Sequence, residues 1–179
     1  MKTKWNLTLL YKSDNDPQIQ KDIDKSIKNV KAFVKNWKTN KEYTKDPKIL
    51  KKALDEYENL IATTGICSKP SYYIELRNAQ DQTNPSIKEI FSRISDTCIN
   101  LENEIQFFEL NIAKIPKSKQ QLFVNSDELL DYKHYLEGIF KGSKYLLSDK
   151  EEKIFNITSR TAYENWVAMI KELTNKQTA

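Results

Sequence analysis

The sequence predicts an all-α fold, a multi-helix bundle that forms a single helical domain over residues 1–179. Only 3 Gly and 5 Pro interrupt the chain, which favours helices over a turn-rich sheet. No segment alternates polar and apolar residues as a half-buried strand would. Apolar residues instead recur at steps of three and four, as they do on one face of a helix. We therefore expect antiparallel helical hairpins around one long central helix.

A carboxylate or amide residue followed by proline marks the start of three helices. The side chain of the first residue can cap the helix, and proline suits the first turn. This signal occurs at Asp16-Pro17, Asp46-Pro47 and Asn84-Pro85. We expect helices over about 17–38 and 47–64, the second ended by Gly65 in a left-handed conformation. An aromatic-rich helix over about 68–79 should follow.

The longest helix is expected over about 85–114, where Pro116 would end it. Its apolar seam follows a seven-residue repeat: Ile87, Phe91, Ile94, Cys98, Leu101, Ile105, Phe108 and Ile112. Such a seam packs against a long helix at a crossing angle of roughly 20°. Phe107 and Leu110 widen the apolar arc beyond that of a two-stranded seam, so antiparallel packing within the chain is favoured over a coiled-coil dimer.

The remaining residues predict shorter helices over about 116–123 and 127–140. Residues 148–151 form a capping box that would open another short helix. A last helix is expected near 161–174, with an apolar stripe of Tyr163, Trp166, Val167 and Ile170.

Charge is distributed unevenly along the chain. Residues 1–52 hold 14 Lys and 6 acidic residues, a net charge of +8, whereas residues 53–179 hold 15 basic and 19 acidic residues, a net charge of −4. The lysines of the first helix fall largely away from its apolar stripe and are interpreted as a solvated face. Because Arg is scarce and no aromatic residues interleave with these lysines, no nucleic-acid partner is expected. No apolar run approaches the roughly 20 residues that span a bilayer, and no signal peptide is evident, so we expect a cytoplasmic protein without a membrane partner.

The chain has one histidine, His134, which excludes a zinc site built from two histidines. On a helix, Asp131 and Glu137 could approach it at spacings of three. A structural histidine, hydrogen-bonded or stacked among Tyr132 and Tyr135, is favoured over metal binding or acid–base chemistry. No phosphate-binding loop, GxSxG or HExxH motif is present.

The other candidate groups are also interpreted as structural. Cys67 and Cys98 form no CxxC pair and are expected to be reduced, buried thiols. Glu102, Glu104 and Glu109 are expected to be solvated helix charges rather than a catalytic dyad. We therefore assign no catalytic, cofactor-binding or metal-binding residue to this chain.

Five segments, in order, resemble the N-terminal helical domain of the oligoendopeptidase F family of zinc metallopeptidases, relatives of thimet oligopeptidase. The segment WNLTLLY, residues 5–11, is similar to the family's WDLSxLY start. The others are YYIELRNA (72–79), which is similar to an LRxA helix, FFEL (107–110), YKHYLE (132–137) and LSDKEE (147–152), which are similar to FFELE, YRHYLE and LSEEEE. The resemblance covers residues 5–174 and consists of structural segments.

The resemblance implies a parent enzyme that is a zinc metalloendopeptidase acting on oligopeptides, with HExxH and a further Glu ligand in a catalytic lobe. This chain, with one histidine, is expected to lack that activity and to bind no zinc itself. As the N-terminal lobe it would cover the active-site channel and restrict substrates to short peptides. Its expected partners are the catalytic lobe and such peptides.

Two further expectations follow. The alternative function is a free-standing helical module that binds another protein through an apolar seam or through its basic first helix. If the lobe interpretation holds, one surface should be unusually apolar where the catalytic lobe packs, and the isolated chain is expected to self-associate through it.

Overall fold

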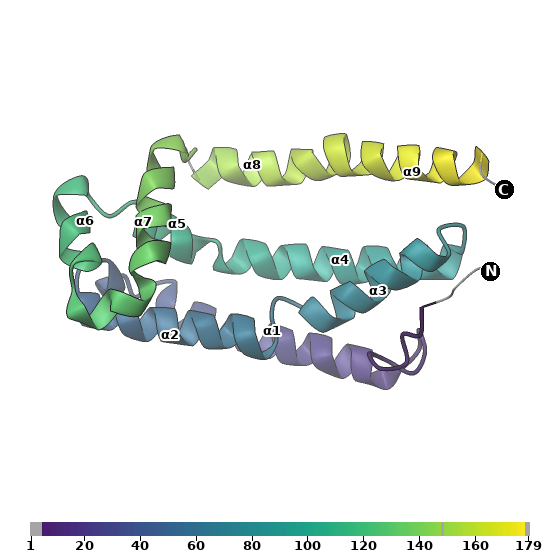
Figure 1. The fold of residues 1–179 in the computed structure, drawn as a ribbon, viewed down its shortest axis with the longest axis horizontal. Helices are drawn as coiled ribbons and strands as arrows, with labels where there is room; N and C mark the ends of the chain where they lie inside the picture. Colours follow the sequence, from purple (N-terminus) through teal and green to yellow (C-terminus); the bar gives the residue numbers. More distant parts are fainter. Residues whose placement is uncertain (1–4, 148, 178–179) are drawn as a thin grey trace.

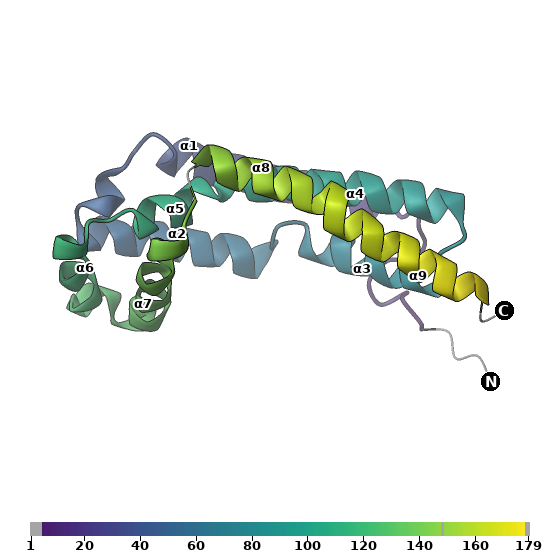
Figure 2. The ribbon, with the colours of Figure 1, turned by 90° about the horizontal axis from the view of Figure 1, so that it is seen from above.

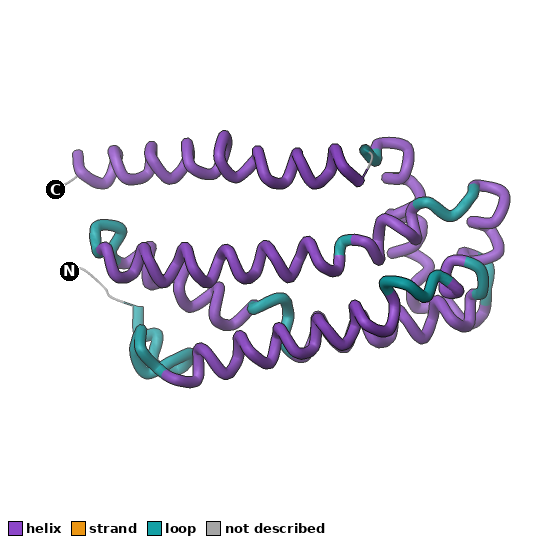
Figure 3. Tube along the Cα trace, turned by 180° about the vertical axis from the view of Figure 1, so that it is seen from behind, coloured by secondary structure: helices purple, strands orange, loops and turns teal. Residues whose placement is uncertain are grey.

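The computed structural model describes residues 5–147 and 149–177, and within these ranges it contains helices and loops but no strand (Figure 3). The predicted all-α class is confirmed. The α-helices are α1 (Pro17–Trp37), α2 (Pro47–Thr63), α3 (Ser68–Gln80), α4 (Pro85–Ile105), α5 (Phe107–Ala113), α6 (Lys117–Val124), α7 (Lys133–Gly142), α8 (Asp149–Ser159) and α9 (Asn165–Gln177). The shorter elements are the 3₁₀ turns η1 (Glu42–Thr44), η2 (Asp127–Tyr132) and η3 (Ser143–Tyr145), and the π-helical turn η4 (Arg160–Glu164).

The three proline signals open helices where the sequence predicts. Asp16 accepts a hydrogen bond from the backbone N–H of Gln18 at 2.9 Å, and Asp46 does the same for Lys48 at 2.8 Å. Asn84 accepts from Ser86 at 3.0 Å. Each cap satisfies a backbone donor that has no partner within its own helix, so these starts are fixed locally.

The helices run back and forth along the long axis of the molecule (Figure 1). α1 runs in one direction, α2 and α3 return in succession, and α4 and α5 repeat the direction of α1. α1 contacts α2, α3 and α4, and α3 packs along α4. α6 and α7 cover one end, where α7 contacts α5 and α6. The last leg, formed by α8, η4 and α9, runs antiparallel to α4 on the side away from α1 and α2.

Aromatic rings form the centre of the core between α1, α2 and α5. The Phe33 ring meets Phe108 edge to face at 5.2 Å, and Tyr57 lies 5.1 Å from Phe108. Tyr43 of η1 is fully buried, lies 5.2 Å from Phe108 and 5.8 Å from Trp37, and its hydroxyl accepts a hydrogen bond from Asn111 at 3.0 Å. Favourable ring pairs add to the large area that these side chains remove from water.

The long helix expected over 85–114 is interrupted at Gln106, which is a correction. α4 ends at Ile105, and α5 begins at Phe107. Phe108 and Ile112 are nevertheless fully buried, as are most members of the seam in α4. The heptad spacing therefore continues across the interruption, which is why periodicity alone does not reveal it.

The helix expected over 127–140 begins instead as the 3₁₀ segment η2 and becomes α-helical only at Lys133. Leu129 departs from helical geometry, with φ −112° and ψ 16°, and is fully buried. The Tyr132 hydroxyl lies 2.8 Å from Asp55 Oδ1 and 2.6 Å from Glu58 Oε2. These contacts with α2 hold η2 in its tighter form.

The segment before α1 has no regular structure, yet it is held against α1 and α3. The Arg77 guanidinium forms a two-point ion pair with Asp14, with Nε–Oδ1 at 2.7 Å and Nη2–Oδ2 at 2.8 Å. The Tyr73 hydroxyl donates to the same carboxylate at 2.7 Å, and the Tyr11 hydroxyl donates to Asp22 at 2.7 Å. Gln80 Nε2 donates to the backbone oxygen of Trp5 at 2.9 Å. We call this set of contacts the N-terminal clasp.

Two of the segments that carry the family resemblance, residues 5–11 and 72–79, meet beside the clasp, where the Tyr11 and Tyr73 rings pack edge to face at 5.1 Å. The guanidinium of Arg77 holds the pKa of Asp14 below its usual range, despite the opposing effect of partial burial. Burial, with the Asp14 hydrogen bond, raises the pKa of Tyr73. These segments thus contribute Tyr11, Tyr73 and Arg77 to the contacts that hold the start of the chain.

Both cysteines are buried free thiols, Cys67 fully and Cys98 at 6% exposure. Cys67 adopts a left-handed conformation with φ 58° in the turn that separates α2 from α3. The neighbouring Cys67 thiol, together with burial, raises the pKa of Cys98. A thiol with a raised pKa is a weak nucleophile, which is consistent with a packing role for Cys98.

Among the described residues, no helix is long and apolar enough to cross a bilayer.

Candidate functional site

The C-terminal leg is the part of the fold with the least packing against the rest. α8, η4 and α9 follow one another without Gly or Pro, so the short helix and the last helix expected from the sequence join into one rod. Ser148 of the expected capping box lies outside the described residues. From above, the rod crosses obliquely over α4, and α9 ends near α3 (Figure 2). The π-helical turn η4 lies within the rod, between α8 and α9.

One set of large apolar side chains on this rod is exposed, and we call it the C-terminal apolar face. It consists of Ile154 (60% exposed), Phe155 (60%), Ile157 (57%), Tyr163 (71%), Trp166 (61%), Met169 (43%), Ile170 (44%) and Leu173 (51%). Three of the four residues in the stripe predicted for the last helix belong to it. The fourth, Val167, is partly buried and faces a groove.

The amount of apolar area on this face is large enough to matter for association. Fully burying one large apolar side chain contributes about 1.5–3 kcal/mol. Covering eight that are about half exposed would contribute on the order of 10 kcal/mol before the costs of association. Exposed apolar area on soluble domains is typical of interaction sites. The described residues thus include a set of exposed apolar side chains on α8, η4 and α9, and its relation to a catalytic lobe stays a prediction.

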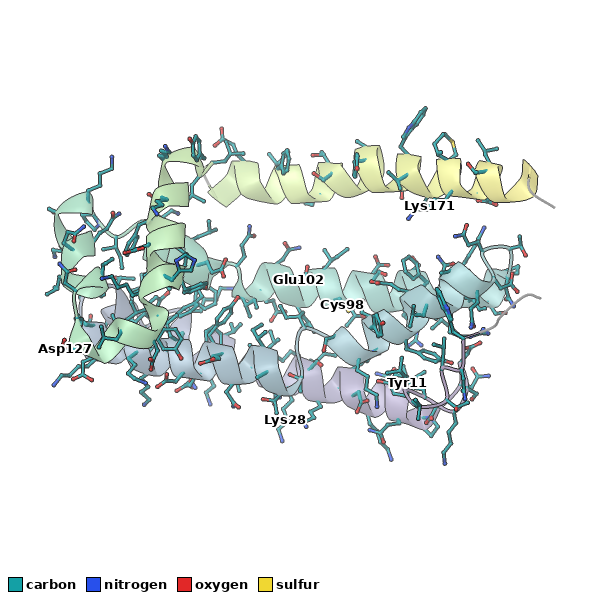
Figure 4. All side chains as sticks on the ribbon, viewed as in Figure 1. Tyr11, Lys28, Cys98, Glu102, Asp127 and Lys171 are labelled. Carbon is teal, nitrogen blue, oxygen red and sulfur yellow. The ribbon has the colours of Figure 1, made fainter. Side chains whose placement is uncertain are left out.

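Beside the face lies a groove of about 550 Å³ between α9 and the α3–α4 pair. Its lining mixes apolar, amide, hydroxyl and charged groups: Asn78, Gln82, Lys88, Phe91, Ser92, Ser95, Ile99, Tyr163, Asn165, Val167, Ala168, Lys171 and Glu172. Lys88 Nζ lies 3.2 Å from Glu172 Oε1 and ties α4 to α9. Lys171 lies on the side of α9 that faces α4 (Figure 4).

The groove offers both hydrogen-bonding and apolar groups. Amide and hydroxyl side chains can bond peptide N–H and C=O groups, and Lys171 supplies a positive charge for a carboxylate. Phe91, Ile99 and Val167 supply apolar contacts. No role for Lys88 or Lys171 was predicted from the sequence, because periodicity does not give the position of α9 beside α4.

His134 is on the exposed side of α7 rather than in a hydrogen-bonded or stacked position, which corrects the favoured prediction for it. The hydroxyls of its neighbours bind other helices: Tyr132 reaches α2, and Tyr135 donates to Glu109 Oε1 at 2.7 Å. Among the described residues, no group of three or more His, Cys, Asp or Glu side chains is placed to hold a metal ion.

The three glutamates singled out from the sequence do not act together. Glu109 accepts hydrogen bonds from Tyr135 and, at 3.3 Å, from Tyr57, so it is a structural acceptor rather than only a solvated charge. Burial raises the pKa of Glu102 on α4. Glu104 is partly buried.

The comparisons with known proteins agree with the resemblance seen in the sequence. The Oligopeptidase F family profile matches residues 111–176, which include the C-terminal apolar face. An oligoendopeptidase F homolog of Borreliella burgdorferi is 27% identical over 173 residues, which cover 96% of this chain and 28% of that protein. The plasmid oligoendopeptidase F of Lactococcus lactis subsp. cremoris is 25% identical over 157 residues, and the group B oligopeptidase PepB of Streptococcus agalactiae is 23% identical over 162. Each of these two matches covers 86% of this chain and 24% of the relative.

The chain thus spans about a quarter of the length of the curated relatives it matches. No solved structure gives a significant match.

Proposed function

Since this chain is an N-terminal domain of the oligoendopeptidase F family, we propose that it is a non-catalytic lobe of a zinc metallopeptidase that covers the active-site channel and restricts substrates to short peptides. The observation that carries the proposal is the C-terminal apolar face, which lies within the family match. A lobe that closes over a catalytic centre needs such a surface on the side where the rest of the enzyme packs.

The side chains of this domain support a separation of substrate gating from catalysis. Zinc hydrolysis needs converging ligands and a general base beside the bound water. No group among the described residues fits that set, so we assign zinc and catalysis to another part of the parent enzyme. The lobe would contribute one wall of the channel. The groove beside α9, with amide and hydroxyl groups along it, suits contact with an extended peptide.

The test uses the part of the Borreliella burgdorferi relative that this chain does not match, produced separately. We expect the two polypeptides to bind, and the bound chain to suppress cleavage of casein while leaving cleavage of a quenched short peptide intact. Casein cleavage that persists at saturating chain would contradict a gating role. The chain alone, with added zinc, should hydrolyse neither substrate; chelator-sensitive hydrolysis by it would refute the assignment of catalysis elsewhere.

A matched pair of variants locates the contact. Trp166→Ser, Ile170→Ser and Leu173→Ser together should weaken binding at least about tenfold, because they remove exposed apolar area from the proposed interface. The control Leu9→Ser, Leu122→Ser and Leu130→Ser changes three apolar side chains that are 91%, 56% and 61% exposed elsewhere. It should bind normally. Equal weakening by both variants would show that binding does not depend specifically on the C-terminal apolar face.

A free-standing module that binds another protein is the second candidate function, and the same apolar face favours it. It predicts that the chain binds a different protein through α8 and α9 while the remainder of the peptidase does not compete. If the remainder of the peptidase competes with the other protein for the chain, the lobe function is favoured; if it does not, the free-standing module is favoured.

A further inference from the structure

Six lysines of the first helix form a single line on the outer surface, which we call the lysine stripe: Lys21, Lys25, Lys28, Lys31, Lys35 and Lys38. All six are exposed. At 100° per residue they fall within an arc of about 140°, and at 1.5 Å per residue they extend over about 25 Å. The buried residues of α1, among them Ile23, Val30 and Trp37, lie on the opposite face.

These charges are not neutralised by the protein. None of the six forms an ion pair or side-chain hydrogen bond with another residue in the described ranges, and the one acidic residue within their arc is Asp24, which accepts a hydrogen bond from Gln20 at 2.9 Å. Several lysines in the next elements are paired. Lys45 lies 2.7 Å from Glu42, and Lys51 lies 2.8 Å from Asp55. The stripe is therefore a local concentration of positive charge that its neighbours lack.

The stripe also lies away from the candidate functional site. Lys28, at the centre of its arc, points outward on the lower side in Figure 4, whereas α8 and α9 lie on the upper side with α4 between them. A partner on the stripe would leave the C-terminal apolar face and the groove accessible.

The composition of the stripe restricts the kind of partner. Protein interfaces depend on aromatic and Arg anchors and are depleted in Lys, and the stripe contains no aromatic residue and no Arg. Lysine can contact guanine, but the stripe has none of the Arg and stacking side chains that add base specificity and single-strand binding. Lysines without apolar anchors suit diffuse attraction to a flat layer of anionic headgroups, where each contributes near the surface. A flat layer can meet the whole line at once, whereas the phosphates of a duplex curve away from a straight helix.

We propose that the lysine stripe of α1 binds the surface of anionic lipid bilayers and orients the domain with the C-terminal apolar face away from the membrane. Contact of this kind lies at the surface and needs no spanning helix. It is electrostatic, so it depends on anionic lipid and weakens with salt.

The test is flotation of the full chain with vesicles of phosphatidylcholine, alone or with about 30% phosphatidylserine, in about 0.1 M and about 0.5 M NaCl. Binding is expected only with phosphatidylserine and should fall at least about tenfold at the higher salt. Binding to both lipids that persists in salt would overturn the proposal and indicate insertion of the C-terminal apolar face. No binding to either lipid would overturn it as well.

Two charge-reversal variants locate the contact. Lys25→Glu, Lys28→Glu, Lys31→Glu and Lys35→Glu change the net charge from +4 to −4 and should reduce partitioning at least about tenfold. The control Lys117→Glu, Lys119→Glu, Lys133→Glu and Lys141→Glu makes the same change at exposed positions of α6 and α7 and should keep most of the binding. Circular dichroism checks that both fold. Equal losses of vesicle binding in the two variants would show that net charge, not the lysine stripe, governs binding. Displacement of the chain from vesicles by a short DNA duplex, at equal concentrations of DNA and lipid phosphate, would favour a nucleic acid as the partner.

Discussion

The N-terminal clasp and the C-terminal rod differ in how regular their backbone is and in how far their side chains are buried. The clasp is irregular backbone, yet its side chains reach specific partners on α1 and α3, and Tyr11 and Tyr73 are each 2% exposed. The rod of α8, η4 and α9 is regular helix, yet eight of its large apolar side chains remain exposed. A regular helical backbone therefore does not indicate that the apolar side chains of a segment are buried.

This contrast separates two kinds of family resemblance. Residues 5–11 and 72–79 resemble the family and meet within this domain through the rings of Tyr11 and Tyr73. Residues 111–176 match the family profile and carry the surface that has no cover among the described residues. We expect substitutions in the first region to lower the stability of the domain, and substitutions in the second to weaken its association with other polypeptides.

The largest expected effect is from Asp14→Ala, which removes the carboxylate that Arg77 and Tyr73 share. Asp14 and Arg77 side chains are 25% and 27% exposed, so the loss leaves a charge and a hydroxyl partly buried without their acceptor. We expect the free energy of unfolding to fall by about 2–3 kcal/mol. Urea titration measures it. Glu42→Gln, which breaks the exposed pair with Lys45, should cost less than about 1 kcal/mol and serves as the control.

The same carboxylate predicts acid sensitivity of the clasp. Its pKa is lower in the folded than in the unfolded chain, so ionised Asp14 stabilises the fold above the unfolded pKa of 3.8. That stabilisation is lost as pH falls from about 5 through 3.8 and towards the folded pKa. Asp14→Asn should reduce the slope of unfolding free energy against pH in this range. An unchanged slope would show that other carboxylates account for acid sensitivity.

A smaller effect is expected on association. The isolated chain should form dimers or larger species at high concentration, and replacing Trp166, Ile170 and Leu173 by Ser should raise the dissociation constant at least about tenfold. Sedimentation velocity over a range of concentrations measures this. A compact monomer at the highest concentration would show that the C-terminal apolar face does not pair with a second copy.

Local signals determined which boundaries the sequence could predict. The starts at Pro17, Pro47 and Pro85 follow from caps formed within three residues, so no distant contact is needed. The interruption at Gln106 and the 3₁₀ form of η2 lie beside Phe108 and Tyr132, whose partners are on helices far away in sequence. The heptad pattern is the same with or without such an interruption.

The residues of the apolar stripe could be predicted from the sequence, but their exposure and the position of the groove could not. The stripe of Tyr163, Trp166 and Ile170 is visible in the sequence, whereas its exposure depends on what α9 packs against. The groove requires the position of α9 over α4, tied by Lys88 and Glu172, and no periodicity encodes that contact. The absence of Gly and Pro from 149–177 was the available sign that the two expected helices would join.

The smallest expected effect completes the comparison between the two regions. Trp166→Ser, Ile170→Ser and Leu173→Ser should lower the unfolding free energy of the monomer less than Asp14→Ala does, because these side chains are 61%, 44% and 51% exposed and do not pack against the hydrophobic core. Dilute urea titration, below the association range, measures it. A loss as large as that of Asp14→Ala would mean that these side chains stabilise the domain itself, and the distinction between a clasp for stability and a rod for association would fail.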